Sequence, residues 1–127
     1  MTCLMIDIEG FDLKSEDIRR IKHPLVGGII LFARNFSDRS QLSELILAIR
    51  EIRNGLVISV DHEGGRVQRF RESFTLLPDM GLIGKNYNHD KSQAIIIANL
   101  TGWIIAKELG ELGIDFSFTP VLDIDYG

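Results

Sequence analysis

Three times along this chain, an apolar segment runs into an acidic turn that carries glycine. The three segments are Leu4–Gly10, Val57–Gly65 and Pro120–Gly127. The carboxyl ends of parallel strands meet at one edge of a sheet, and polar residues gathered there build the ligand site of a β/α barrel. The repeated carboxylates therefore predict an α/β fold with a polar rim at the carboxyl ends of its strands.

Between these segments, strand and helix signals alternate without a linker. Short apolar runs predict strands over Val26–Phe32 and Leu56–Val60. A helix is predicted after Asp38, because apolar residues then recur every three or four positions, and Asp38 with Gln41 resembles a capping box. A second long helix is predicted from about Asp90 to Leu109. Sequential strands joined by helices predict right-handed crossovers and a parallel sheet.

Three local predictions complete the order of elements. Ser15 is predicted to cap a short helix that Pro24 closes. The segment from Pro78 to Lys85 is predicted to be loop. In the last strand, Ile114–Phe118, large apolar and small polar residues alternate. We expect the large apolar residues to meet the helices, and the strand face that bears Asp61 to look into the barrel.

The length of the chain limits how much of a barrel it can form. An eight-stranded β/α barrel needs about 250 residues, so 127 residues supply roughly half of its units. The sequence therefore predicts about four parallel strands with intervening helices, half of a (β/α)8 barrel. We expect residues 1–127 to form a single partial domain.

Composition narrows the partners and the compartment. The net charge of −4 comes without a cluster of Lys and Arg, which argues against nucleic acid as a partner. No apolar run reaches the roughly 18 residues that span a bilayer, so no membrane association is expected. The lone Cys3 is compatible with a reducing compartment, and the first residues lack a basic leader. These features predict a cytoplasmic protein.

The densest polar stretch is Asp61–Phe70. Its glycines allow positive φ and close approach to a ligand, while Asp61 offers two acceptor oxygens and Arg69 a forked donor. A sugar suits both groups, because each hydroxyl donates and accepts. An equally weighted alternative is that Asp61 and Arg69 pair only with each other and order the loop. His62 is expected to be a loop residue that faces away from the Asp61 carboxylate.

Cofactor sites are not predicted. Gly64 and Gly65 are not followed by the Gly-Lys-Ser/Thr sequence of a phosphate-binding loop. His23, His62 and His89 lie at no spacing typical of a metal site. We therefore expect no metal and no cofactor.

Several motifs together carry a family resemblance that covers essentially the whole chain. The segment Asp61–Arg69 resembles the N-terminal part of glycoside hydrolase family 3, and within it the bacterial β-N-acetylglucosaminidases that trim recycled cell-wall muropeptides. The other matching motifs, in order, are Gly27–Phe32 with Arg34 and Asn35, Glu108 with Leu109, Leu112–Ile114, and Pro120–Asp123.

The resemblance implies a β/α barrel and retaining hydrolysis of terminal β-linked N-acetylglucosamine, without metal or nucleotide. It assigns Asp61 and Arg69 to substrate binding, and Arg34 and Asp123 to supporting roles at the rim. The nucleophile and the acid/base of the family have no counterpart here and are expected beyond Gly127. Because retaining hydrolysis requires both groups, the 127-residue chain alone is expected to be inactive.

Two alternatives stay open. One is a family relative that acts on another β-glycoside, such as a β-glucosidase. The other is a non-catalytic sugar-binding or assembly module. For either form, a half barrel would present unpaired strand edges, which favour self-association.

Overall fold

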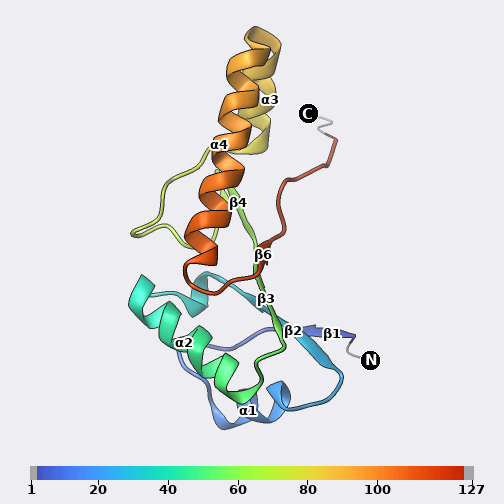
Figure 1. Ribbon diagram of the computed structural model, residues 1–127, viewed down its shortest axis with the longest axis vertical. Helices are drawn as coiled ribbons and strands as arrows, with labels where there is room; N and C mark the ends of the chain where they lie inside the picture. The colour runs from blue at the N-terminus through green and yellow to red at the C-terminus, as the bar shows by residue number, and fades with distance from the viewer. Residues whose placement is uncertain (1–2, 125–127) are drawn as a thin grey trace.

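The computed structural model describes residues 3–124, which form a sheet, two covering helices and a projecting helix pair (Figure 1). Within these residues, the strands β1 (Leu4–Ile6), β2 (Val26–Leu31), β3 (Val57–Val60) and β6 (Phe116–Ser117) form a parallel sheet in the order β1-β2-β3-β6. The connections contain α1 (Ser15–Ile21), the 3₁₀ turn η1 (Ala33–Asn35), α2 (Arg39–Ile52), the hairpin strands β4 (His62–Gly64) and β5 (Val67–Gln68), α3 (Met80–His89) and α4 (Lys91–Gly110). The predicted α/β fold with parallel strands and intervening helices is confirmed.

Helix α2 builds the core against one face of the sheet. Asp38 caps it as predicted, since its Oδ1 accepts a hydrogen bond from the Gln41 amide at 2.9 Å. Fully burying an aliphatic side chain contributes about 1.5–3 kcal/mol, so the shared interface of α2 and the sheet contributes strongly to stability. Its buried members are Leu42, Leu45, Ile46 and Ile49 on α2, and Ile29, Leu31, Ile58 and Val60 on the strands.

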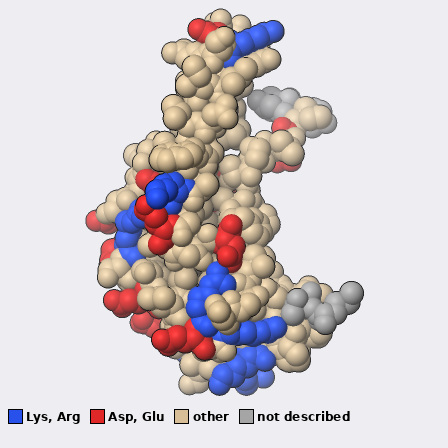
Figure 2. All heavy atoms as spheres, viewed as in Figure 1, with Lys and Arg blue, Asp and Glu red and all other residues tan. Residues whose placement is uncertain are grey.

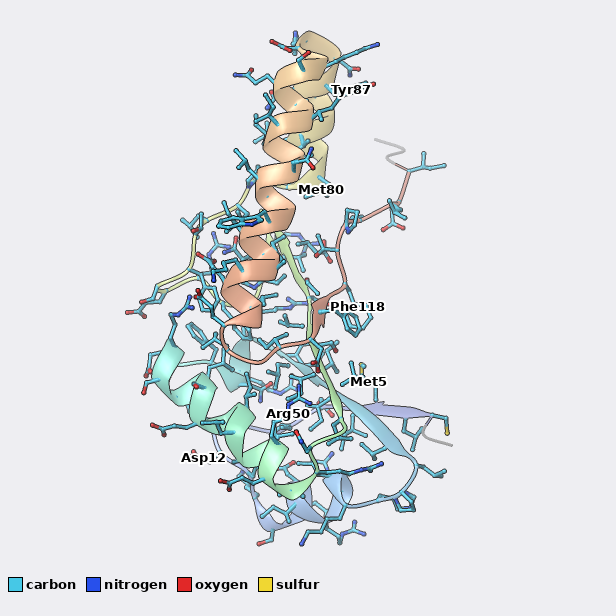
Figure 3. All side chains as sticks on the ribbon, viewed as in Figure 1. Met5, Asp12, Arg50, Met80, Tyr87 and Phe118 are labelled. Atoms are coloured by element: carbon cyan, nitrogen blue, oxygen red, sulfur yellow. The ribbon has the colours of Figure 1, made fainter. Side chains whose placement is uncertain are left out.

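The last strand presents its large residues to the opposite face. Phe116 pairs with Ser59, which places both side chains on the same side of the sheet. Phe116 and Phe118 are 40% and 44% exposed, and Figure 3 shows Phe118 and Met5 on the side away from α2. The expectation that these phenylalanines meet the helices is therefore wrong.

Asp115, a small polar residue just before this strand, has partners on the helix side. Asp115 Oδ2 accepts hydrogen bonds from the Ile58 amide at 2.6 Å and from Arg50 Nη2 of α2 at 2.8 Å. These bonds anchor the polar face of the strand against α2. Alternation defined the two faces of the strand, but it could not show which face the helices cover.

Two predictions about where helices begin are wrong. The segment from Pro78 to Lys85 is not loop, because α3 begins at Met80; Asp79 caps it by accepting a hydrogen bond from the Leu82 amide at 2.7 Å. The cap of α1 is Lys14 and not Ser15, which is the first helical residue. The Lys14 amide donates to Asp17 Oδ2 at 3.1 Å.

Helix α4 pairs with α3 and projects from the sheet (Figure 1). Its predicted start and end are confirmed to within a residue, with Asp90 as the cap. The residues that it buries are Ala94, Thr101, Ile105 and Leu109, whereas Trp103 is 64% exposed. No helix within residues 3–124 combines the length and the apolar character needed to cross a membrane.

Candidate functional site

Asp61 and Arg69 form an ion pair at the carboxyl end of β3. Arg69 Nη2 donates to Asp61 Oδ2 at 3.0 Å, and both side chains are about two-thirds to three-quarters buried. The hairpin explains the geometry, because His62 pairs with Gln68 across the antiparallel strands β4 and β5. The next cross-strand position is occupied by Asp61 and Arg69, so the register of the hairpin brings them together.

Two glycines shape the hairpin turn, as the sequence predicted. Gly64 has φ +95° and Gly65 has φ +59°, a region that side chains disfavour. A Cβ atom on Gly64 would lie 2.3 Å from the Pro78 carbonyl oxygen, and one on Gly65 would lie 2.6 Å from Asp79 Cβ. The turn therefore packs directly onto the segment that leads into α3.

A second ion pair lies at the neighbouring strand ends. Asp7 follows β1 and pairs with Arg34, which follows β2. Phe32 connects the two pairs, since its ring centroid lies 4.5 Å from Arg34 Cζ and 5.8 Å from Arg69 Cζ. Guanidinium groups at these distances interact favourably with an aromatic face. Phe32 was not predicted to belong to the site, although its place between β2 and Arg34 was a usable signal.

Arg34 and Asp123, the two residues expected to have supporting roles, differ in their contacts. Arg34 also donates from Nε to the Ile8 carbonyl at 3.1 Å, so it is held firmly within the rim. Asp123 is exposed and has no hydrogen bond or ion pair with the residues that the structure describes. Their supporting roles remain predictions.

His62 lies inside the fold and not in a loop, which corrects the prediction. It is the first residue of β4 and is 1% exposed, and its ring packs against those of Phe70 and Phe74, which also contact each other. Burial lowers the pKa of His62 to about 4, and Glu108 opposes this by favouring the charged form. His62 is therefore neutral at neutral pH and acts as a core residue next to Asp61.

Elsewhere in the molecule, fewer polar side chains are gathered into a possible ligand site. A mostly apolar hollow of about 470 Å³ lies between α4 and β6, where Thr101, Ile105 and Phe116 contribute to its wall. Within residues 3–124, no group of three or more His, Cys, Asp and Glu side chains is arranged to hold a metal ion. The charged rim around Asp61 and Arg69 is therefore the candidate site.

The comparisons with known proteins agree on one family. The family described as glycosyl hydrolase family 3 N terminal domain matches residues 4–126. A beta-hexosaminidase from Methylobacillus flagellatus is 58% identical over 125 residues, which are 98% of this chain and 36% of that protein. A beta-hexosaminidase from Bordetella pertussis is 52% identical, with 98% and 36% covered.

A solved structure shows the same fold. NagZ from Neisseria gonorrhoeae in complex with N-trifluoroacetyl-D-glucosamine has a TM-score of 0.93 and 47% identity, over 98% of this chain and 37% of that one. The chain thus spans a little over a third of the length of these relatives. Because the family match extends over almost every residue, this chain belongs to glycoside hydrolase family 3.

Proposed function

We propose that residues 1–127 are a single partial domain, the N-terminal part of a β-N-acetylhexosaminidase barrel. The whole enzyme would release terminal β-linked N-acetylglucosamine from cell-wall muropeptides in the cytoplasm. Support comes from the relatives named beta-hexosaminidase and from the family member that binds an N-acetylglucosamine analogue. The observation that carries the proposal is the largely buried Asp61–Arg69 pair at the carboxyl ends of the strands.

The chemistry of this pair suits a sugar. Vicinal hydroxyl groups each donate and accept, so the Asp61 carboxylate can accept from two of them while Arg69 donates to a third oxygen. The Arg69 side chain remains about one-third exposed, so its guanidinium can still be reached from solvent.

Asp61 is proposed to bind substrate and not to attack it. Its carboxylate already accepts a hydrogen bond from the Arg69 guanidinium, which makes it a poorer nucleophile. Retaining hydrolysis needs a nucleophile and an acid/base on either side of the glycosidic bond. In this proposal both would come from sequence beyond Gly127, and neither a metal nor a cofactor takes part.

A chimaera tests the function directly. This chain would replace the 125 matching residues of the Methylobacillus flagellatus beta-hexosaminidase, to which it is 58% identical. The chimaera should hydrolyse 4-nitrophenyl N-acetyl-β-D-glucosaminide and release N-acetylglucosamine from a muropeptide, and the Asp61→Ala chimaera should do so more slowly. The chain alone should show no hydrolysis above background.

Each contrary result has a clear meaning. A folded chimaera that prefers the aryl β-glucoside would favour the β-glucosidase alternative. A folded chimaera that binds N-acetylglucosamine without hydrolysing the glycoside would favour a binding module. Turnover by the chain alone that disappears in Asp61→Ala would make a carboxylate of this chain catalytic and would contradict the proposal.

A further inference from the structure

Two hydroxyl groups from β6 and the residues after it clamp the backbone beside Asp61. Ser117 Oγ accepts a hydrogen bond from the His62 amide at 3.0 Å. Thr119 Oγ1 donates to the His62 carbonyl at 3.2 Å, and the two hydroxyl oxygens lie 2.8 Å apart. Both backbone polar groups of His62 are thus held by side chains.

The direction of each hydrogen bond follows from counting hydrogens. A hydroxyl group has one hydrogen to donate. Thr119 uses its hydrogen on the His62 carbonyl, so the bond between the two hydroxyls must run from Ser117 to Thr119. The result is a closed and directed ring: His62 N–H to Ser117 Oγ, Ser117 O–H to Thr119 Oγ1, and Thr119 O–H to His62 O.

The ring of hydrogen bonds lies where the main-chain hydrogen bonds between β3 and β6 end. The last main-chain bond between them runs from the Phe118 amide to the Val60 carbonyl at 3.1 Å. The Thr119 amide instead bonds to the Ser117 carbonyl at 2.8 Å, within its own segment. Without the hydroxyls, the peptide groups of His62 would be left without these partners at the edge of the site.

The ring of hydrogen bonds adjoins the backbone of Asp61. The His62 amide belongs to the peptide that joins Asp61 to His62, so fixing it limits rotation of the Asp61 backbone. The His62 side chain is held as well, because its ring packs against those of Phe70 and Phe74. With its backbone held in this way, the Asp61 carboxylate meets Arg69 at 3.0 Å.

We infer that Ser117 and Thr119 are positioning residues for sugar binding, which act by holding the Asp61–His62 peptide and so aim the Asp61 carboxylate. This inference rests on the proposed function of the Asp61–Arg69 pair. It assigns a role to two residues whose side-chain hydrogen bonds, within residues 3–124, go to His62 and to each other and not to Asp61 or Arg69. A site held in position before the substrate arrives spends less binding energy on ordering.

A double-mutant cycle in the active chimaera separates positioning from general stability. Ser117→Ala and Thr119→Val should each lower kcat/KM by about 3- to 10-fold, the range of one lost hydrogen bond. Thr119→Ser keeps the hydroxyl and should retain nearly all activity. In the Asp61→Ala background, Ser117→Ala should have no further effect, because the residue acts through Asp61. Ser92→Ala, an exposed hydroxyl on α4, is the matched control.

Amide exchange on the 127-residue chain tests the ring without any activity. Ser117→Ala should speed exchange of the His62 N–H by about 10-fold or more, because that amide loses its acceptor. Unchanged exchange would overturn the inference whether or not the chimaera is active. If the losses of kcat/KM from Ser117→Ala and Asp61→Ala were additive, the inference would be overturned as well. If Ser117→Ala speeds exchange of the His62 N–H but the parent chimaera is inactive, that result would count against the proposed function alone.

Discussion

The imidazole of His62 packs against the ring of Phe70, with the two centroids 5.7 Å apart. Phe74 lies at 5.6 Å from the same imidazole and Phe36 extends the cluster. His62 Nδ1 is buried and has no hydrogen-bond partner within residues 3–124. His62, which is next to the proposed sugar-binding residue Asp61, thus places a titratable group inside an aromatic cluster.

Acid should therefore destabilise the fold through His62. Burial lowers its pKa in the folded chain to about 4, from an ordinary value of 6.5. Between these values the unfolded chain binds a proton that the folded chain does not, so stability falls as pH falls from 6.5 to 4. The expected loss is about 3 kcal/mol between pH 7 and pH 4, which urea unfolding at several pH values would measure.

His62→Phe isolates this effect from the titration of carboxylates. The variant keeps an aromatic ring in the cluster and has no proton to gain, so its stability should depend less on pH. Charged groups also lie near the cluster: Glu108 favours protonation of His62, and Arg39 stacks on Phe74 with its Cζ 4.7 Å from the ring centroid. Parallel pH profiles for the two proteins would contradict the prediction.

Periodicity and capping predicted the elements that are stabilised locally. Helix α2 carries its own cap at Asp38 and its own apolar stripe, so its bounds could be predicted from nearby residues alone. Helix α3 could not be predicted in this way. It contains Gly81, Gly84 and Asn86, which are poor helix formers, and it buries Ile83 as part of its packing against α4.

The candidate site shows the same difference between contacts that are close in the sequence and contacts that are distant. Asp61 and Arg69 were predicted because they lie eight residues apart in one polar segment, and the hairpin register then pairs them. The ring formed by Ser117 and Thr119 joins residues more than 50 positions apart in the sequence. Such a contact depends on which strands become neighbours and on which face each strand turns inward. Neither follows from local pattern.

The glycines of the hairpin should tolerate no side chain. Gly64→Ala would place Cβ 2.3 Å from the Pro78 carbonyl oxygen at a φ of +95°. We expect it to lower the free energy of unfolding by at least about 2 kcal/mol. Gly102→Ala on α4 is the control, because its Cβ would meet nothing within 4 Å, and alanine should stabilise a helix by about 0.5–1 kcal/mol. Equal stabilities in urea would show that the turn is not constrained.

The ion pair should matter for turnover more than for folding. In the chimaera, Asp61→Ala and Arg69→Ala should each lower kcat/KM by about 10- to 100-fold, since a charge-assisted hydrogen bond contributes about 1.5–3 kcal/mol. Arg19→Ala removes an exposed ion pair with Glu16 and should leave kcat/KM unchanged. If both site variants kept full activity while losing thermal stability, the pair would serve only to order the loop.

The isolated chain should self-associate through α4. Ile96, Leu100 and Trp103 follow one another at helical spacing and are 59%, 54% and 64% exposed. On the face in view, Figure 2 shows few charged atoms on this projection between its base and its tip. An exposed apolar stripe of this kind favours association.

Light scattering should therefore give a mass well above 14.3 kDa. Leu100→Glu combined with Trp103→Glu should lower that mass, whereas Gln93→Glu, a charge on the exposed first turn of α4, should not. A monodisperse 14.3 kDa species at high concentration would instead favour a stand-alone module.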